Sequence, residues 1–320
     1  MRPLVTLTGN LLAERTLELA DRWEEGRTHR AVRESFQVGG KGFNVAKMLH
    51  RLGQPVTAAG LVGGAAGEEC RAWLAQHAPY PVRLFDSDAP TRSGFVVRAR
   101  GRAETTFFAP DRMAGPRALS ACAEFLNTLP AGTGVALCGS FPGWAEPPAA
   151  ELRAALADVA RRGMLVVDTY GPPLAELVGR PLQLVKINRA EFDALWPAAD
   201  RAIALPDRLG QARQRWPVVH WVITDGPRPV WLASPHALES FAPPPIEEVS
   251  ATGSGDVLLA GLLHTWFSHA GSLAEALRFA LPLAAANAAS SGVADFPFAA
   301  LPGDLQARFE HPGPVSVLRK

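Results

Sequence analysis

Short, continuously apolar runs alternate with amphipathic helical stretches along most of this chain. The apolar runs have the length of β-strands and lie at 4–7, 56–61, 135–138, 165–168, 182–186 and 218–223. The helical stretches lie at 42–52, 68–76, 149–162 and 206–215. Buried strands that are connected through helices form parallel sheets with helices on both faces. The alternation therefore predicts an α/β fold with a mostly parallel central sheet covered on both sides.

Two segments, 11–38 and 92–109, interrupt this alternation. Both have the pattern of extended strands without an intervening helix. We expect them to form a small antiparallel β-sheet beside the main body, in the position of a lid; the alternative is that they are edge hairpins of the central sheet. A chain of 320 residues can form one large α/β domain or two smaller ones. We expect a single domain over 1–320 that includes these lid segments.

The charge and cysteine content exclude several classes of partner and site. A formal net charge of +1 produces no field that would attract nucleic acid or an anionic membrane. Cys70, Cys122 and Cys138 are isolated, which argues against a disulfide framework or a zinc knuckle. The apolar run at the N-terminus is too short for a signal peptide, and no run reaches the roughly 20 residues that span a bilayer. We therefore expect a cytoplasmic protein.

The motif Thr252-Gly253-Ser254-Gly255-Asp256 directly precedes a long apolar run and is a candidate phosphate site. Its glycines allow successive N–H groups to turn toward one point, and a helix N-terminus adds partial positive charge there. An acid in such a site is unfavourable unless it has a chemical role, such as a general base for a hydroxyl. The alternative is that Thr252 or Asp256 only caps a core helix. Spacing excludes a Walker loop and a dinucleotide fingerprint.

A second glycine-rich motif, Gly39-Gly40-Lys41-Gly42, stands two residues before Asn44. The glycines allow the backbone to approach a ligand closely, and Lys41 and Asn44 provide hydrogen-bond donors from the start of a helix. This combination suits a polyol or a phosphorylated sugar. The alternative is a strand-to-helix turn with a solvated lysine.

A third motif runs from Lys186 through Ile187 and Asn188 to Glu191. Asn188 and Glu191 have the spacing of a capping box, which is the purely structural interpretation. In the functional interpretation, both side chains lie on one rim and organise Mg²⁺ through water beside ATP phosphates.

Taken in order, the three motifs resemble those of the ribokinase-like PfkB family of carbohydrate kinases. Residues 39–46, with 52–53 and 60–64 behind them, are similar to its N-terminal signature, and 252–256 to its C-terminal signature. Residues 186–191 resemble its K-P-N-x-x-E element. This combination favours the general base over the helix cap for Asp256.

Within that family the chain is most similar to the branch of 1-phosphofructokinases and tagatose-6-phosphate kinases. The G-S-G-D form of the motif, 139–143 and 167–171 carry this likeness. The branch grips a phosphosugar with basic side chains, and Arg30, Lys41 and Arg92 stand at matching positions. Glu14 takes the place of an aspartate that holds sugar hydroxyls, with altered spacing, which puts the identity of the sugar in doubt.

The resemblance implies a ribokinase-like fold and ATP-dependent transfer of the γ-phosphate to a sugar hydroxyl. The expected acceptor is a sugar phosphate of the fructose-1-phosphate or tagatose-6-phosphate type. A kinase of an unphosphorylated sugar or nucleoside remains an alternative, as does an inactive regulator that binds a sugar or nucleotide. Pairing of two copies through the lid is expected by analogy.

The resemblance also implies a role for each candidate residue. Asp256 would accept the proton, and the amides of Gly253, Ser254 and Gly255 would hold charge on the transferred group. The residues implied to bind the acceptor are Gly39, Gly40, Lys41, Asn44, Arg92, Arg30 and Glu14. Those implied to bind ATP are Lys186, Asn188, Glu191, Thr224, Gly226, Thr252 and Asn287, with Glu191 holding Mg²⁺ through water. For Gly226, an ordinary turn is an equal alternative.

Overall fold

The central sheet dominates the computed structural model, which describes residues 1–102, 104–268, 271–301 and 303. Its strand order is β13-β12-β11-β10-β9-β8-β1-β4-β5. The nine strands are β1 (Leu4–Thr8), β4 (Val56–Val62), β5 (Val82–Asp86), β8 (Gly134–Cys138), β9 (Leu165–Asp168), β10 (Leu182–Asn188), β11 (Val218–Asp225), β12 (Arg228–Ala233) and β13 (Leu238–Phe241). Strands β5 to β11 in this order are parallel, whereas β12 and β13 pair antiparallel. The predicted mostly parallel sheet is confirmed.

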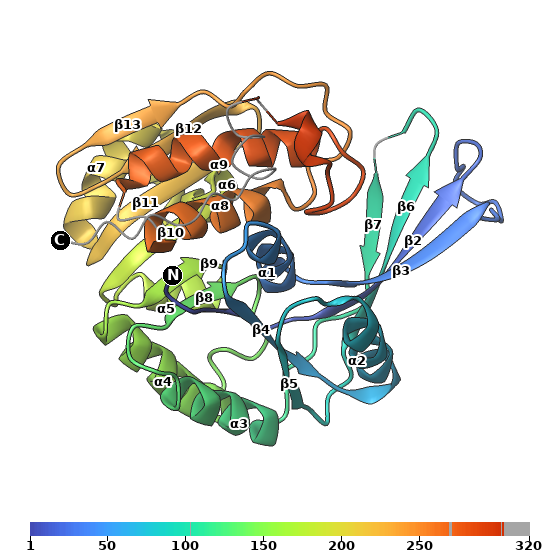
Figure 1. The fold of residues 1–320 in the computed structure, drawn as a ribbon, viewed down its shortest axis with the longest axis horizontal. Coiled ribbons are helices and arrows are strands. Elements are labelled where there is room, and N and C mark those ends of the chain that lie inside the picture. The colour runs from blue at the N-terminus through green and yellow to red at the C-terminus, as the bar shows by residue number, and fades with distance from the viewer. Residues whose placement is uncertain (103, 269–270, 302, 304–320) are drawn as a thin grey trace.

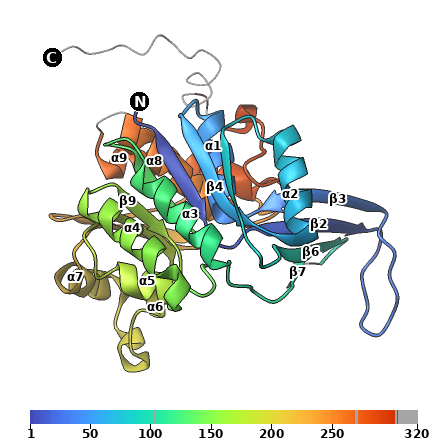
Figure 2. The ribbon, with the colours of Figure 1, turned by 90° about the horizontal axis from the view of Figure 1, so that it is seen from below.

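Helices cover both faces of this sheet (Figure 1, Figure 2). One face carries α1 (Lys41–Arg51), α2 (Gly64–His77), α8 (Ser254–Ser268) and α9 (Leu273–Ala288). The other carries α3 (Pro116–Asn127), α4 (Ala150–Arg161), α5 (Pro172–Leu177), α6 (Arg189–Asp193) and α7 (Leu205–Arg215). Short 3₁₀ turns lie at Pro147–Ala149, Ala198–Ala202 and Phe298–Ala300.

Two hydrophobic cores result, one on each face of the sheet. In β8, Val135 and Leu137 pack into the core beneath α3 and α4, whereas Ala136 and Cys138 pack into the core beneath α1 and α8. Successive side chains of a strand point to opposite faces, so a strand buried on both sides must be apolar at every position. That requirement explains the continuous apolar runs in the sequence. Among the described residues, no helix has the length and apolar character that crossing a membrane needs.

The segments at 11–38 and 92–109 form a separate four-stranded sheet, the lid, which projects from one side of the body (Figure 1, Figure 2). Its strands are β2 (Leu12–Leu19), β3 (Arg33–Gly39), β6 (Arg92–Ala99) and β7 (Thr105–Phe108), in the order β3-β2-β6-β7. The alternative of edge hairpins on the central sheet is therefore wrong.

The predicted antiparallel pairing of the lid is correct for its outer pairs but wrong at its centre. Strands β2 and β3 and strands β6 and β7 pair antiparallel, whereas β2 and β6 run parallel. The reason is topological: β2 follows β1 and β6 follows β5, and these parallel strands send the chain off the same edge of the central sheet. Both central lid strands therefore leave the body in the same direction.

Candidate functional site

Polar side chains gather where the central strands of the main sheet end at their carboxyl edge. Asp168 is the last residue of β9, and Asn188 is the last residue of the neighbouring β10. Thr224 stands opposite Asn188 in β11. Ligands of open α/β sheets bind at this edge because the loops that follow the strands can part there. Residues far apart in the sequence thus meet along one line.

Asp168 is the centre of a buried charge network. Its side chain has no solvent exposure, and its two oxygens accept hydrogen bonds from Lys41 Nζ at 2.9 Å and from Lys186 Nζ at 2.7 Å. Burial alone would raise the pKa of the Asp168 carboxyl, but the two ammonium groups outweigh burial and hold that pKa below its usual value. The sequence analysis included Asp168 only within the strand at 165–168 and within 167–171, one of the segments that carry the family likeness, and gave it no role in the site.

Lys41, the first residue of α1, joins this network to Glu191. Its ammonium lies 3.4 Å from Glu191 Oε1, and the field of Asp256 also acts on it. Burial lowers the pKa of Lys41, but the surrounding carboxylates raise it by more. Lys41 is therefore ion-paired, and the alternative of a solvated lysine does not describe this structure.

Asp256 lies in the first turn of α8 and is 5% exposed. Its Oδ2 accepts a hydrogen bond of 2.8 Å from Asn44 Nδ2 of α1. Burial raises the pKa of Asp256 to about 6; Lys41 works against this shift, and Asp168 adds to it. A carboxylate with this pKa is mostly ionised at pH 7 and is suited to accepting a proton.

Glycines in both signature motifs are required by close contacts. Gly253 has a φ of 75°, and a Cβ there would lie 2.2 Å from Val293 Cγ1. A Cβ on Gly255 would lie 2.8 Å from Lys186 Nζ, and one on Gly42 would lie 2.4 Å from Thr8 Oγ1. The first motif thus packs against an ammonium group. Gly42 packs α1 against the end of β1. The sequence analysis had expected the glycines of this motif to admit a ligand.

Asn287 of α9 holds the loop that precedes α8. It is fully buried, and its Nδ2 donates to the Thr252 carbonyl and to Ser254 Oγ, both at 3.0 Å. Its Oδ1 accepts from the Ala294 amide at 2.7 Å. Arg51 of α1 donates to the Ala294 carbonyl at 2.9 Å. Asn287 of α9 therefore holds the loop that carries Gly253 directly, and Arg51 of α1 supports it through Ala294.

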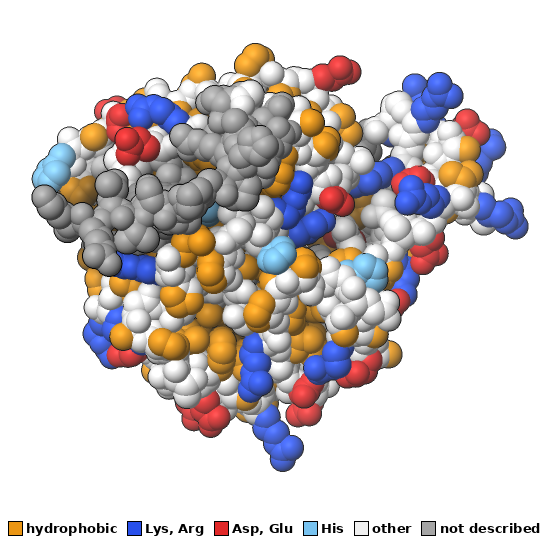
Figure 3. Space-filling view, in the orientation of Figure 1, with side chains coloured by type: hydrophobic (Ala, Val, Ile, Leu, Met, Phe, Trp, Pro, Cys, Tyr) orange, Lys and Arg blue, Asp and Glu red, His pale blue; other side chains and the backbone are white. Residues whose placement is uncertain are grey.

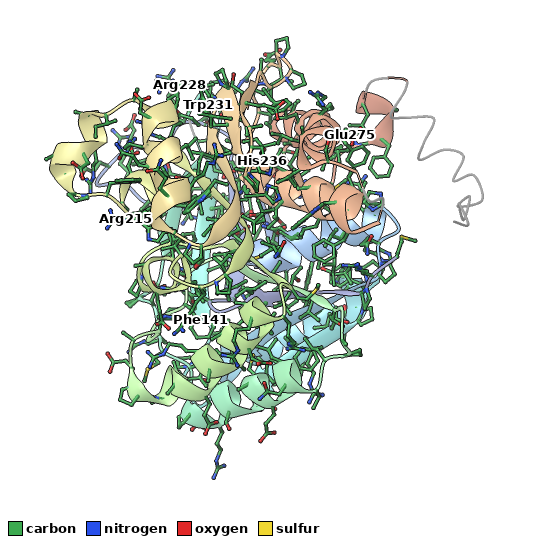
Figure 4. The ribbon with its side chains drawn as sticks, turned by 90° about the vertical axis from the view of Figure 1, so that its left-hand side faces the viewer. Phe141, Arg215, Arg228, Trp231, His236 and Glu275 are labelled. Carbon is green, nitrogen blue, oxygen red and sulfur yellow. The ribbon has the colours of Figure 1, made fainter. Side chains whose placement is uncertain are left out.

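Glu191 forms the capping box that the structural interpretation of its motif predicts. Asn188 and Glu191 form a complete capping box at the start of α6, with Asn188 N donating to Glu191 Oε2 at 2.9 Å. The other carboxylate oxygen faces Lys41. Thr224 lies one strand further out, and Gly226, with a φ of 57°, forms the turn between β11 and β12. Figure 4 places Arg228 of β12, two residues past that turn, near the top of the view, with Phe141 below the middle.

Arg92 lies at the start of lid strand β6 and binds Asp111, which also accepts from Asn10 after β1. Its Nη1 donates to Asp111 Oδ1 at 2.9 Å, and its guanidinium stacks 4.6 Å from the Phe108 ring centre. Asn10 Nδ2 donates to the same Asp111 oxygen at 2.8 Å and to Ser140 Oγ at 2.9 Å. Sequence reasoning did not single out Asn10 or Asp111, because no local pattern marks either residue.

Two other predicted acceptor residues lie on the lid. Glu14 of β2 accepts a hydrogen bond from Gln37 of β3, and its Oε2 lies 3.1 Å from where a Cβ on Gly39 would be. Burial raises the pKa of Glu14. Arg30, by contrast, is exposed in the connection between β2 and β3, which extends away from the body (Figure 2). Figure 3 shows this projecting region rich in charged side chains. The structure does not bring Arg30 to the carboxyl edge.

The sequence between residues 4 and 299 matches the model of the pfkB family carbohydrate kinases. This chain therefore belongs to the PfkB family of carbohydrate kinases, and it is an ATP-dependent sugar or sugar-phosphate kinase.

Relatives agree with that membership, and a solved structure has the same fold. A 1-phosphofructokinase of Xanthomonas campestris is 30% identical over 286 residues, which cover 86% of this chain and 88% of the relative. An ATP-dependent 6-phosphofructokinase isozyme 2 of Escherichia coli is 26% identical over 277 residues, covering 84% and 87%. The crystal structure of the phosphofructokinase-2 from Escherichia coli in complex with fructose-6-phosphate matches with a TM-score of 0.78 at 24% identity, covering 90% of this chain and 94% of that one. The ribokinase-like fold is confirmed.

The opposite pKa shifts of Asp256 and Asp168 predict opposite pH dependences of stability. The folded state holds the Asp256 proton until about pH 6, whereas an unfolded aspartate loses it near 3.8. The wild type therefore loses stability as the pH rises through this window, and Asp256→Asn does not. We expect the thermal midpoint of Asp256→Asn, relative to wild type, to rise between about pH 4 and pH 6 and then level off.

Asp168→Asn is the matched control for this measurement. The lowered pKa of Asp168 contributes stability above its unfolded pKa, and that contribution disappears as the pH falls. The deficit of Asp168→Asn should therefore be largest at neutral pH and shrink in acid. Parallel pH profiles for the two variants in thermal unfolding would contradict the assignment.

Proposed function

We propose that this kinase transfers the γ-phosphate of ATP to a hydroxyl of a sugar phosphate of the fructose-1-phosphate or tagatose-6-phosphate type. Asp256 is the proposed general base. The observation that carries this role is its buried carboxylate at the start of α8, oriented by Asn44 and with a pKa raised to about 6. A carboxylate with this pKa accepts a proton better than an exposed one while it remains ionised at neutral pH.

The surrounding residues suit the charge that develops on the transferred group. The Ser254 amide donates to the Ala251 carbonyl at 3.2 Å, so the amides that would stabilise this charge are those of Gly253 and Gly255. The N-terminal end of α8 and the ammonium group of Lys186 add positive charge beside Gly255. These groups are held by the protein before the reaction begins, which is the condition for efficient electrostatic stabilisation.

The donor set fits Mg²⁺ that is bound partly by water and phosphate. Among the described residues, no group of three or more His, Cys, Asp or Glu side chains forms a protein-only metal site. Mg²⁺ beside nucleotide phosphates keeps several waters and needs only one or two carboxylates. Glu191, with one oxygen committed to the capping box, is the residue proposed to hold it through water. When bound, Mg²⁺ would neutralise charge on the ATP phosphates.

Asn188, Thr224, Gly226 and Thr252 are proposed to bind ATP together with Lys186. The first three lie at the ends of adjacent strands β10 and β11. The role of Asn287 is better described as support, since its side chain is saturated by the Thr252 loop and by Ala294.

The position of Arg92 favours an acceptor that carries a phosphate. Its guanidinium fork suits phosphate oxygens, and its side chain is mostly buried at the junction of the lid and the carboxyl edge. Lys41, Asn44, Gly39 and Gly40 remain proposed contacts to the sugar. Arg30 keeps a role only if another copy of the chain or a movement of the lid brings it to a site.

Replacing Asp256 by Asn should lower turnover by about 10²–10⁴-fold, because a positioned general base contributes that much. The KM for ATP should change little. In the wild type, kcat/KM for the acceptor should fall below about pH 6 as Asp256 becomes protonated. Steady-state kinetics across this pH range provide the measurement, and near wild-type turnover of the variant would reject the role.

A panel of sugars, sugar phosphates and nucleosides, assayed by ADP release, tests the acceptor class. We expect phosphosugars to be turned over best, and Arg92→Met to raise the KM for them far more than the KM for ATP, since only the acceptor's phosphate loses a partner. Arg83→Met, an exposed arginine on β5, is the matched control. Faster turnover of an unphosphorylated sugar or a nucleoside would favour the alternative acceptors.

Pairing of two copies through the lid is a further proposal. Phe95 and Phe107 stand opposite each other in the lid sheet and are 44% and 56% exposed. Exposed aromatic pairs of this kind favour association. We expect the wild type to sediment as a dimer and Phe107→Glu to shift it toward the monomer, because a charge would then be buried in the interface. A monomeric wild type would contradict the proposal.

A further inference from the structure

Asp111 occupies the anion-binding position of Arg92. The carboxylate oxygen Oδ1 accepts from Arg92 Nη1 at 2.9 Å and from Asn10 Nδ2 at 2.8 Å. Asn10 is in turn 2.9 Å from Ser140 Oγ. The carboxylate is thus held by a guanidinium and an amide, which are donors that would equally suit a phosphate oxygen.

The contact between Arg92 and Asp111 uses only one of the hydrogen-bond donors of the guanidinium group. One of its nitrogens donates to one carboxylate oxygen. Guanidinium groups form bidentate hydrogen bonds with strong anion partners, and this contact is not bidentate. In the described part of the chain, the buried Nε of Arg92 has no hydrogen-bond partner. A small hollow of about 20 Å³ beside it is lined by polar groups that include Thr91 and Arg112. The site therefore retains unused donor capacity for an anion with more oxygens.

The position along the sheet edge is also suitable for the phosphate of an acceptor. Strands β9, β8, β1 and β4 lie side by side in this order. Asp168 ends β9, Asn10 follows β1, and Gly63 after β4 donates a hydrogen bond to Thr91 Oγ1, next to Arg92. Adjacent strands are about 4.8 Å apart, so two strand spacings, roughly 10 Å, separate the ends of β9 and β1. A hexose phosphate can cover this span from the charge network to Asn10, which shares Asp111 Oδ1 with Arg92.

We propose that Asp111 is a specificity-determining residue whose carboxylate occupies the place of the acceptor's phosphate and must leave before a phosphosugar binds. This inference rests on the proposed function, in which Arg92 binds that phosphate. Asp111 then acts as a built-in competitor, which lowers the affinity for phosphorylated acceptors and leaves the affinity for ATP unchanged.

The surroundings of Asp111 allow it to leave. Its side chain is 51% exposed, whereas that of Arg92 is 14% exposed, so the arginine is fixed and the acid is free to turn into solvent. Residues 109–113, between β7 and α3, are exposed and belong to neither element. A phosphate has more charge and more acceptor oxygens than a carboxylate, so it should displace Asp111 from Arg92 and Asn10.

Asp111→Ala removes the competitor and tests the inference. A partly exposed ion pair is worth at most a small free energy, so the KM for fructose-1-phosphate or fructose-6-phosphate, whichever is turned over, should fall by about two- to fivefold. The KM for ATP should not change. Thermal unfolding at increasing inorganic phosphate measures the same effect without turnover, because a ligand raises the midpoint according to its Kd. The phosphate Kd should fall by the same factor.

Two further variants separate the possible outcomes. Asp86→Asn breaks an exposed ion pair between the end of β5 and Arg71 of α2. This variant should change neither KM nor phosphate binding. Arg92→Met should weaken phosphate binding. If it does, and Asp111→Ala leaves the phosphosugar KM unchanged or raises it, the inference about Asp111 is wrong. The proposed binding of the acceptor's phosphate by Arg92 then stands. If Arg92→Met leaves phosphate binding and the phosphosugar KM unchanged, Arg92 does not bind the acceptor's phosphate, and the proposed role of Asp111 is wrong as well.

Discussion

The paired ammonium groups of Lys41 and Lys186 on the buried Asp168 are the interaction on which the rest of the site depends. A fully buried carboxylate is unstable in an apolar core unless cations compensate it, and the loss of one partner would leave an uncompensated charge. Because the two lysines come from α1 and β10, this requirement ties both elements to the end of β9. The same helix α1 then brings Asn44 to Asp256. One electrostatic constraint thus joins the N-terminal and C-terminal motifs.

The strand order turns this constraint into a line of subsites. Strands β10 and β11 bring the residues proposed for ATP to one end of the carboxyl edge. At the other, Asn10 follows β1, and Gly63 after β4 holds Thr91, next to Arg92. Asp256 lies on α8 against α1, facing the network in between. The loop before α8 is supported by Asn287 and, through Ala294, by Arg51. A site built on strand ends and helix starts is more rigid than one built on loops alone.

The lid and its flanking loop are where this member of the family is free to differ. The charge network uses residues of the core elements, whose positions the fold holds in place. Asp111 and Glu14, by contrast, stand on a loop and on a lid strand, where substitutions are tolerated and specificity changes readily. In our proposal, an acid beside Arg92 sets the choice of acceptor by competition, without altering the chemistry of transfer.

The sequence by itself determined the parallel sheet and the capping box at Asn188, and it marked the lid segments and Asp256 as candidates. Each of these follows from periodicity or from a compact motif, so local physics is enough to read it. Only the tertiary structure decided that Lys41 is ion-paired, that Asp168 unites the motifs, that β2 and β6 run parallel, and that Arg92 meets Asp111 while Arg30 lies apart. These facts depend on contacts between segments remote in the chain, because burial and charge compensation arise only once the strands are ordered side by side.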